Sequence, residues 1–194
     1  MASVTGLVIA GGKASRMGGT DKGLLLLNGR PMIEWVIDRL RPQVASLILN
    51  TNASAARYAE FGVPVIGDQI TGHTGPLAGL HAGLAAATTP LLACVPCDAP
   101  LLPADLVERQ YQALIEASAD VAVVRTAGGL QPVFMLCRRE LQGSIGAFLL
   151  EGGRALHEWL RRVRSVEVAF ADDAAFANLN TPEELRAMEA KLAP

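Results

Sequence analysis

The chain has 194 residues and a formal net charge of −2 at pH 7; 51% of the residues are hydrophobic, 19% are charged and 5% are aromatic. Nucleic-acid-binding proteins usually have a net basic balance, so this charge disfavours that class. The sequence has no uninterrupted apolar stretch of the roughly 18 to 20 residues that cross a membrane, and its three cysteines do not fit a secreted disulfide framework.

These properties predict one domain over residues 1–194, which is long enough to bury a full core. Because aromatic residues are few, the core must be built from Ala, Val, Ile and Leu, as is typical of buried parallel strands covered by helices. Residues 1–6 lack the basic segment of a secretory signal. We therefore expect a cytoplasmic protein with reduced thiols and no contact with membranes or nucleic acid.

The first predicted element is a buried strand at residues 7–9, followed by a loop rich in glycine and cations. Glycines in such a loop let backbone N–H groups approach an anion closely. The four glycines of the loop before its last lysine are Gly11, Gly12, Gly18 and Gly19. The charged residues among the first 30 are Lys13, Arg16, Lys22, Arg30 and a single acid, Asp21. This local excess of positive charge in a net-negative chain predicts a site for a polyanionic small molecule.

The loop matches neither of the two best-known phosphate-binding fingerprints. The dinucleotide pattern G-x-G-x-x-G needs a glycine two positions after Gly11 or Gly12, and the chain has none there. The P-loop pattern G-x-x-x-x-G-K-[ST] needs a glycine at position 7 and Ser or Thr at position 14, where Leu7 and Ala14 stand. A different kind of phosphate site is therefore predicted.

The rest of the chain alternates predicted helices and strands. The pattern predicts helices at 31–41, 53–60, 77–87, 103–115, 139–150, 155–162 and 182–191. It predicts strands at 46–50, 63–66, 91–95, 120–124 and 166–170, and an antiparallel strand at 131–136. This alternation predicts an α/β fold with a doubly wound, mostly parallel sheet and helices on both faces.

Three helix starts carry local signals. Pro31 and Pro103 are predicted at the first position of their helices, where proline is well tolerated. The last helix has Thr181 as its N-cap and Glu184 three residues later, which together form a capping box.

Two glycines, Gly79 and Gly83, interrupt the predicted helix at 77–87. Each costs about 1 kcal/mol relative to alanine in a helix interior. Close approach by a ligand or by a neighbouring element is the simplest reason for both.

Polar side chains follow several of the predicted strands. Asn50 ends one strand and Asn52 comes just after it, Asp68 follows the next strand, and Asp98 follows the strand at 91–95 between two prolines. Ligands of open α/β sheets collect beyond the carboxyl ends of the strands, so these residues are predicted at the same edge as the glycine-rich loop.

This set of residues predicts a nucleotide site with a metal ion. Mg²⁺ is commonly held by one or two carboxylates together with substrate phosphates, and Asp98 is placed to be that ligand. Lys22 and Arg16 would then neutralise the charge that develops as pyrophosphate leaves.

The motifs carry a family resemblance. The segment Ile9-Ala10-Gly11-Gly12-x-x-x-Arg16-Met17-Gly18-x-x-Lys22 resembles the signature of nucleotidyltransferases that activate sugars and cofactors. Four further segments, in the same order along the chain, make it similar to the bacterial molybdenum cofactor guanylyltransferases: Asp21-Lys22-Gly23, Gly75-Pro76-Leu77-Ala78-Gly79, Pro96-Cys97-Asp98-Ala99-Pro100 and Asn178-Leu179-Asn180-Thr181-Pro182-Glu183.

That resemblance implies a Rossmann-like nucleotidyltransferase fold and the transfer of GMP from GTP to molybdopterin, with release of pyrophosphate. It implies nucleotide binding by Ile9, Ala10, Gly11, Gly12, Lys22, Asn50, Asp68, Gly79 and Asp98, with Lys22, Asp98 and Arg16 in catalysis and Mg²⁺ on Asp98. Asp68 suits either the guanine N–H donors or the ribose. The resemblance further implies that Arg154, Asn178 and Asn180 bind the pterin, which agrees with a second region of positive charge at 138–164. Transient contact with other molybdenum cofactor biosynthesis proteins or with acceptor proteins is compatible with this function.

Several alternatives remain at this point. Asp98 could be a turn residue before the next helix, Asn50 and Asn52 could be simple turn residues, and the arginines at 138–164 could form a solvated face. The Cys94-x-x-Cys97 pair lacks a second pair of metal ligands and is not interpreted as a zinc or redox site. A cytidylyltransferase acting on the same pterin, a sugar-phosphate nucleotidyltransferase and a non-catalytic GTP-binding module are the competing functions.

Overall fold

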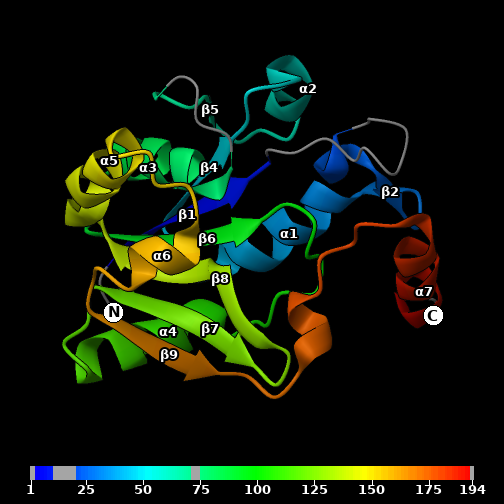
Figure 1. Ribbon diagram of the computed structural model, residues 1–194. Helices are drawn as coiled ribbons and strands as arrows, with labels where there is room; N and C mark the ends of the chain where they lie inside the picture. The colour runs from blue at the N-terminus through cyan, green and yellow to red at the C-terminus, as the bar shows by residue number, and fades with distance from the viewer. Residues whose placement is uncertain (1–2, 11–20, 71–74, 193–194) are drawn as a thin grey trace.

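The computed structural model of the protein describes residues 3–10, 21–70 and 75–192. Its centre is a seven-stranded sheet with the strand order β5-β4-β1-β6-β8-β7-β9, and helices cover both faces (Figure 1). A separate two-stranded sheet pairs β2 with β3. In the described part of the chain, no helix is long and apolar enough to cross a membrane.

The strands are β1 (Val4–Ile9), β2 (Leu26–Leu27), β3 (Arg30–Pro31), β4 (Ser46–Asn50), β5 (Val65–Ile66), β6 (Leu91–Pro96), β7 (Val121–Thr126), β8 (Gly129–Arg138) and β9 (Ser165–Ala169). The α-helices are α1 (Met32–Leu40), α2 (Ala55–Ala59), α3 (Pro76–Ala86), α4 (Leu106–Glu116), α5 (Gln142–Leu150), α6 (Leu156–Leu160) and α7 (Pro182–Leu192). Short 3₁₀ turns are η2 (Lys22–Leu24), η3 (Arg41–Gln43), η4 (Arg139–Leu141) and η5 (Asp173–Phe176).

The large sheet is parallel except at one strand. β1 pairs in parallel with both β4 and β6, β4 pairs in parallel with β5, and β7 pairs in parallel with β9. β8 runs antiparallel to its neighbours β6 and β7. The predicted α/β fold, with a mostly parallel sheet and one antiparallel strand, is confirmed.

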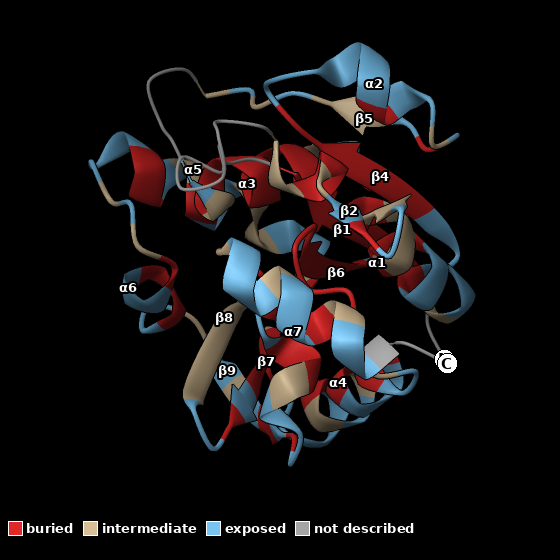
Figure 2. Ribbon diagram, turned by 90° about the vertical axis from the view of Figure 1, so that its right-hand side faces the viewer, coloured by how far each residue is buried: buried red, intermediate tan, exposed pale blue. Residues whose placement is uncertain are grey.

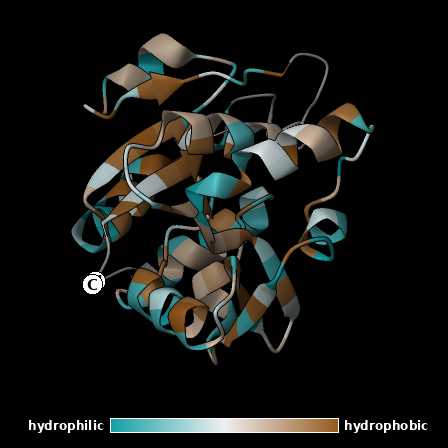
Figure 3. Ribbon diagram, turned by 90° about the vertical axis from the view of Figure 1, so that its left-hand side faces the viewer, coloured by the Kyte–Doolittle hydropathy of each residue, from teal (hydrophilic) through white to brown (hydrophobic). Residues whose placement is uncertain are grey.

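Two hydrophobic layers hold the helices against the sheet. Alternate residues of β1 point to opposite faces, so Val8 packs with α1 and α4 whereas Leu7 packs with α3, α5 and α6. All six residues of β1 are buried because the strand is covered on both sides. Figure 2 shows the buried residues concentrated along β1, β4 and β6, and Figure 3 shows hydrophobic residues predominating inside, with hydrophilic residues on the outer turns of the helices.

The two predicted helix starts at proline are wrong by one and three residues. Pro31 belongs to β3 and pairs with Leu26, so it precedes α1 as the N-cap in an extended conformation. The turn between β2 and β3 places Asn28 and Gly29 at positive φ, which is the geometry expected for a two-residue hairpin. Hairpin pairing therefore takes the proline out of the helix.

Pro103 also lies outside its helix. Helix α4 begins at Leu106, whose backbone N–H donates to the Pro103 carbonyl oxygen at 3.3 Å. The predicted capping box, by contrast, is present: the Glu184 N–H donates to Thr181 Oγ1 at 3.2 Å, and the Thr181 N–H donates to Glu184 Oε2 at 3.0 Å.

The glycines of α3 allow this helix to lie close to the sheet. A Cβ atom built on Gly83 would come within 2.5 Å of the Leu7 Cδ2 atom, and Leu7 is fully buried on β1. The neighbouring element, not a ligand, is therefore the reason for glycine at this position.

We expect Gly83→Ala to lower the free energy of unfolding by about 1 to 2 kcal/mol, because overpacking against Leu7 outweighs the gain in helix propensity. Gly143→Ala in α5 is the matched control, since an added Cβ there meets no atom within 4 Å and that variant should be as stable as the wild type or slightly more so. Urea unfolding of both variants measures the difference. Equal stabilities would show that α3 can move away from β1 at little cost.

Candidate nucleotide site at the carboxyl edge of the sheet

A cavity of about 540 Å³ lies at the carboxyl ends of the parallel strands. The segments that follow β1, β4, β5 and β6 line it, together with the start of α3 and residue Asn178. The described residues that line it are Ile9, Ala10, Asp21, Asn50, Thr51, Asn52, Ala53, Asp68, Gly75, Pro76, Pro96, Cys97, Asp98, Val133 and Asn178. The predicted site edge and this cavity coincide.

Strand register aligns the floor of the cavity. Ile9 is level with Asn50 on β4 and with Pro96 on β6. The Ala10 N–H donates to the Asn50 carbonyl oxygen at 2.8 Å, and the Cys97 N–H donates to the Ile9 carbonyl oxygen at 3.1 Å. The backbone of the three strands is therefore locked together just where the polar side chains leave it.

On one side of the cavity, Lys22 joins two distant parts of the chain. Its Nζ atom lies 3.2 Å from Asp98 Oδ2 and also donates to Asn180 Oδ1. Lys22 sits in the 3₁₀ turn η2, Asp98 follows β6, and Asn180 precedes α7. The Lys22–Asp98–Asn180 cluster thus brings together three residues that sequence reasoning assigned to one site.

Asp98 is a buried carboxylate, with 6% of the residue exposed. Burial raises the pKa of Asp98 above its ordinary value, and the charge and hydrogen bond of Lys22 act in the opposite direction. The Asp98 carboxylate therefore gains from a nearby cation, and Lys22 supplies one.

The backbone of Asp98 also anchors the C-terminal segment. The Leu179 N–H donates to the Asp98 carbonyl oxygen at 3.0 Å, and the Leu179 side chain is buried in a small cluster with Leu27, Met32 and Met188. Helix α7 consequently lies beside the β2–β3 hairpin (Figure 1), and Asn178 reaches the cavity wall.

On the other side of the cavity, two amides hold one carboxylate. Asn50 Nδ2 donates to Asp68 Oδ1 at 2.9 Å, and Asn52 Nδ2 donates to Asp68 Oδ2 at 2.6 Å. The Asp68 N–H in turn donates to Asn52 Oδ1 at 2.8 Å. We call this group the Asp68 clamp.

Gly79 of α3 lies against the Asn50 amide of this clamp. It is not among the residues that line the cavity, but a Cβ atom on Gly79 would clash with Asn50 Oδ1 and come within 3.0 Å of Asn50 Cγ. Gly79 therefore leaves room for the Asn50 side chain, and the direct nucleotide contact that the resemblance implied for Gly79 stays a prediction.

Three predicted site residues, Gly11, Gly12 and Arg16, lie outside the described residues. Arg154 is described: it is exposed in the segment between α5 and α6, and it is not among the residues that line the cavity. The structure therefore brings Asn178 and Asn180 to the candidate site but not Arg154.

Three of the six arginines at 138–164 have acidic partners among the described residues. Arg138 and Arg164 both pair with Asp120, and Arg162 lies 2.6 Å from Glu151. These contacts are exposed, which agrees with the alternative of a solvated face for those residues.

Sequence reasoning did not assign a role to Asp21. This residue lines the cavity, and its Oδ2 atom is buried without a hydrogen-bond partner in the described part of the chain. The sequence signal for Asp21 is its position next to Lys22 in the segment Asp21-Lys22-Gly23. Asn52 was placed at the correct edge from the sequence, but its contact with Asp68 was not foreseen.

The three cysteines are buried free thiols. Burial raises the pKa of Cys94 and Cys97, and raises that of Cys137 to about 12. Within the described ranges, no group of three or more His, Cys, Asp or Glu side chains is arranged to hold a metal ion.

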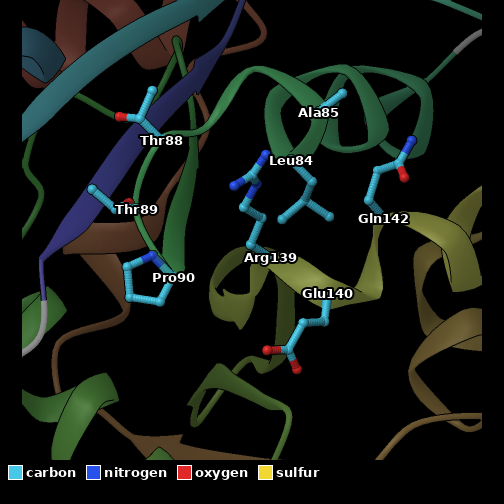
Figure 4. Close-up of a pocket in the computed structure, with 8 residues that line it drawn as sticks. All are labelled: Leu84, Ala85, Thr88, Thr89, Pro90, Arg139, Glu140 and Gln142. Carbon is cyan, nitrogen blue, oxygen red and sulfur yellow. The ribbon is translucent and has the colours of Figure 1, made fainter.

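A second cavity, of about 670 Å³, lies at the opposite edge of the sheet. It is formed by Thr88, Thr89 and Pro90 before β6 and by residues 139–142 after β8 (Figure 4). In this cavity the Arg139 side chain reaches toward Leu84 while Glu140 points away. Because ligands of open α/β sheets bind at the carboxyl edge, the smaller cavity is the better candidate.

Comparison with known proteins agrees with the resemblance found in the sequence. Residues 6–167 match the family model described as the MobA-like NTP transferase domain. The chain is 48% identical over 193 residues to the molybdenum cofactor guanylyltransferase of Cupriavidus taiwanensis, covering 97% of each chain.

Solved structures share the fold at lower identity. Molybdopterin-guanine dinucleotide biosynthesis protein A from Archaeoglobus fulgidus has a TM-score of 0.82 at 21% identity and covers 96% of this chain and 97% of that chain. A CMP:2-keto-3-deoxy-manno-octonic acid synthetase complexed with CTP has a TM-score of 0.77 at 16% identity, with 98% of both chains covered. The same fold therefore accompanies different nucleotide bases.

The burial of Asp98 predicts a pH-dependent stability. A carboxylate whose pKa is raised on folding contributes stability at low pH, and this contribution is lost as the pH rises above its ordinary pKa of about 3.9. In metal-free buffer with EDTA, we expect Asp98→Asn to be at least as stable as the wild type at pH 7, with a difference that shrinks toward pH 4. Urea unfolding at both pH values measures this. A variant that is less stable at pH 7 would show that the pairing with Lys22 outweighs the cost of burial.

Proposed function

The chain belongs to the molybdenum cofactor guanylyltransferases, built on the MobA-like NTP transferase domain, and from this we propose that it transfers GMP from GTP to molybdopterin. The reaction forms the guanine dinucleotide form of the cofactor and releases pyrophosphate. One observation carries the proposal: the near-full-length identity to a guanylyltransferase. We place the reaction in the cytoplasm, as expected from the sequence.

Two polar clusters support this reaction because they sit where the two ends of a nucleotide would lie. Three steps between neighbouring strands, of about 4.8 Å each, separate β5 from β6, which makes roughly 14 Å between the strand ends that carry Asp68 and Asp98. We expect the triphosphate of GTP beside Lys22 and Asp98 and the nucleoside beside Asn50 and Asp68. Ile9 and Ala10 would contact the nucleotide from the floor of the cavity.

The residues at the phosphate end fit a magnesium ion. Asp98 and Asp21 are carboxylates that line the same cavity, and the buried Asp21 oxygen has no protein partner among the described residues. Mg²⁺ prefers such hard oxygen ligands and takes its remaining ligands from phosphates and water. We propose that Asp98 holds the ion with Asp21 as a second carboxylate. When bound, the ion would supply positive charge to the phosphates.

Lys22 would contribute the protein's own charge to the transfer. Lys22 is not among the residues that line the cavity, but its ammonium group is held by Asp98, which does line it, and by Asn180. A cation fixed in this way stabilises charge on the leaving pyrophosphate without having to reorganise. Arg16, which the resemblance assigns to the same task, stays a prediction.

The acceptor would approach from the C-terminal side of the cavity. Asn178 lies in the cavity wall and Asn180 bonds Lys22, so an acceptor phosphate on that side would lie near the catalytic cluster. Arg154 is exposed on another loop, and a role in pterin binding stays a prediction for it. Contacts with other proteins of molybdenum cofactor biosynthesis also remain a prediction.

Base choice separates this function from its closest competitors. We expect GTP with Mg²⁺ to raise the melting temperature much more than CTP or UTP does, because only a bound ligand stabilises the folded state. Pyrophosphate should be released from GTP in the presence of molybdopterin, and release should fall at least about 100-fold in Asp98→Ala, since electrostatic groups of this kind are commonly worth that much. Equal thermal shifts for the three nucleotides would refute the guanylyl assignment. Unchanged release in the variant would remove Asp98 from its proposed role.

Gly79 provides a second test, directed at the nucleoside end. We expect Gly79→Ala to weaken GTP binding about tenfold, because the added methyl group displaces the Asn50 amide from Asp68, at a cost typical of overpacking. Titration calorimetry measures the affinity, and Gly143→Ala serves again as the control with open space around it. Wild-type affinity in Gly79→Ala would show that Asn50 does not need its observed position.

A further inference from the structure

Asn52 makes two of the three hydrogen bonds of the Asp68 clamp. Its Nδ2 atom donates to Asp68 Oδ2, and its Oδ1 atom accepts from the Asp68 backbone N–H. The two residues therefore close a ring in which one amide binds both the main chain and the side chain of Asp68. Neither the motifs nor the resemblance assigned Asn52 a part in the reaction.

The two amides of the clamp differ in their surroundings. Asn50 is buried, with 3% of the residue exposed. Its backbone pairs with β1, and the missing side chain at Gly79 leaves room for its amide. Asn52 is exposed in the bend after β4, and its bonds to Asp68 lie at the surface. An exposed hydrogen bond adds little to folding, because water replaces it when it is lost. The consequence of the Asn52 contact is therefore the orientation of Asp68.

The clamp leaves acceptor capacity on Asp68. An ionised carboxylate has about four lone-pair sites, and among the described residues each of its oxygens accepts from a single side-chain amide. Asp68 lines the cavity, so a remaining site on the carboxylate is available to a ligand there. Two amides at its two oxygens hold the carboxylate plane in one orientation before any ligand arrives.

We propose that Asn52 is a positioning residue that presents the Asp68 carboxylate as a preorganised acceptor for N–H or O–H donors of the nucleoside of GTP. The inference rests on the proposed function, because it takes GTP as the ligand of this cavity. Preorganisation raises affinity by removing the ordering cost of the bound geometry. Asn52 thus acts through Asp68 and need not touch the nucleotide.

Asn52→Asp tests the proposal with almost no change of shape. The variant loses the amide donor and sets a second carboxylate against Asp68, which turns it away. We expect the Kd and the KM for GTP to rise about 10- to 100-fold, the range for a hydrogen bond to a charged group, while kcat changes less than about threefold. Asn52→Ala, which lacks the repulsion, should show a smaller rise in the same direction. Unchanged Kd values in both variants would overturn the proposal.

The exchange variant Asn52→Asp with Asp68→Asn distinguishes positioning from a structural role. It restores one amide and one carboxylate to the pair, so its melting temperature should match the wild type. Its GTP affinity should stay low, because the carboxylate now stands at position 52. Recovery of wild-type affinity would show that only the pairing matters and would overturn the assignment.

Four nucleotide analogues identify the donor from which Asp68 accepts, because each lacks one donor of the nucleoside. ITP lacks the 2-amino group of guanine, 1-methyl-GTP lacks the N1–H, and 2′-deoxy-GTP and 3′-deoxy-GTP each lack one ribose hydroxyl. The analogue without the contacted donor should bind the wild type more weakly than GTP does, and this penalty should disappear in Asn52→Asp. If the penalties of all four analogues are the same in the variant as in the wild type, the proposal is wrong.

Calorimetry with GTP in the absence of an acceptor keeps this test separate from that of the function. A wild-type protein that binds GTP but transfers no GMP would refute the proposed function and leave the role of Asn52 intact. A wild-type protein that transfers GMP, with GTP affinity unaffected in the Asn52 variants, would refute only the role of Asn52.

Discussion

A buried carboxylate that requires a cation organises the carboxyl edge of this sheet. Asp98 is removed from water, and the Lys22 ammonium group offsets part of the cost of its charge. Lys22 also binds Asn180, and the Asp98 backbone holds Leu179. One ion pair therefore ties the turn that follows the glycine-rich loop to the C-terminal segment. Lys22 and Asn180, which are 158 positions apart, meet because the lysine that compensates the buried Asp98 charge also donates to the Asn180 amide oxygen.

The fold was largely predictable because its signals are local. Buried strands in the centre of a parallel sheet are continuous apolar runs, and the capping box at Thr181 is complete within four residues. The error at Pro31 arose where two local signals competed. Pro31 fits a helix start by its own geometry, but pairing of β2 with β3 places it in a hairpin. Residue-level propensity carries no information on such pairing.

The site was predictable in outline and less so in detail. The rule that ligands collect at the carboxyl edge placed Asn50, Asp68 and Asp98 correctly, because it depends only on strand direction. It could not show that Gly79 packs against Asn50, since α3 and β4 are distant in sequence. For Arg154, the sequence indicated a positively charged region at 138–164, but a charge count along the chain does not show where in the fold each charged side chain will lie.

Asp98 and Asp68 have different electrostatic surroundings, so the two ends of the cavity differ. Asp98 is paired with a cation, whereas Asp68 is held by two neutral amides and has no ion pair in the part of the chain that the structure describes. Neutral donors orient a carboxylate without cancelling its charge. Uncharged N–H and O–H donors are therefore favoured beside Asp68. At the other end the Lys22 ammonium group offsets the charge of Asp98, and we expect a bound metal ion to offset that of Asp21, so that phosphates are favoured there. We propose that this difference between the two ends orients a nucleotide in the cavity.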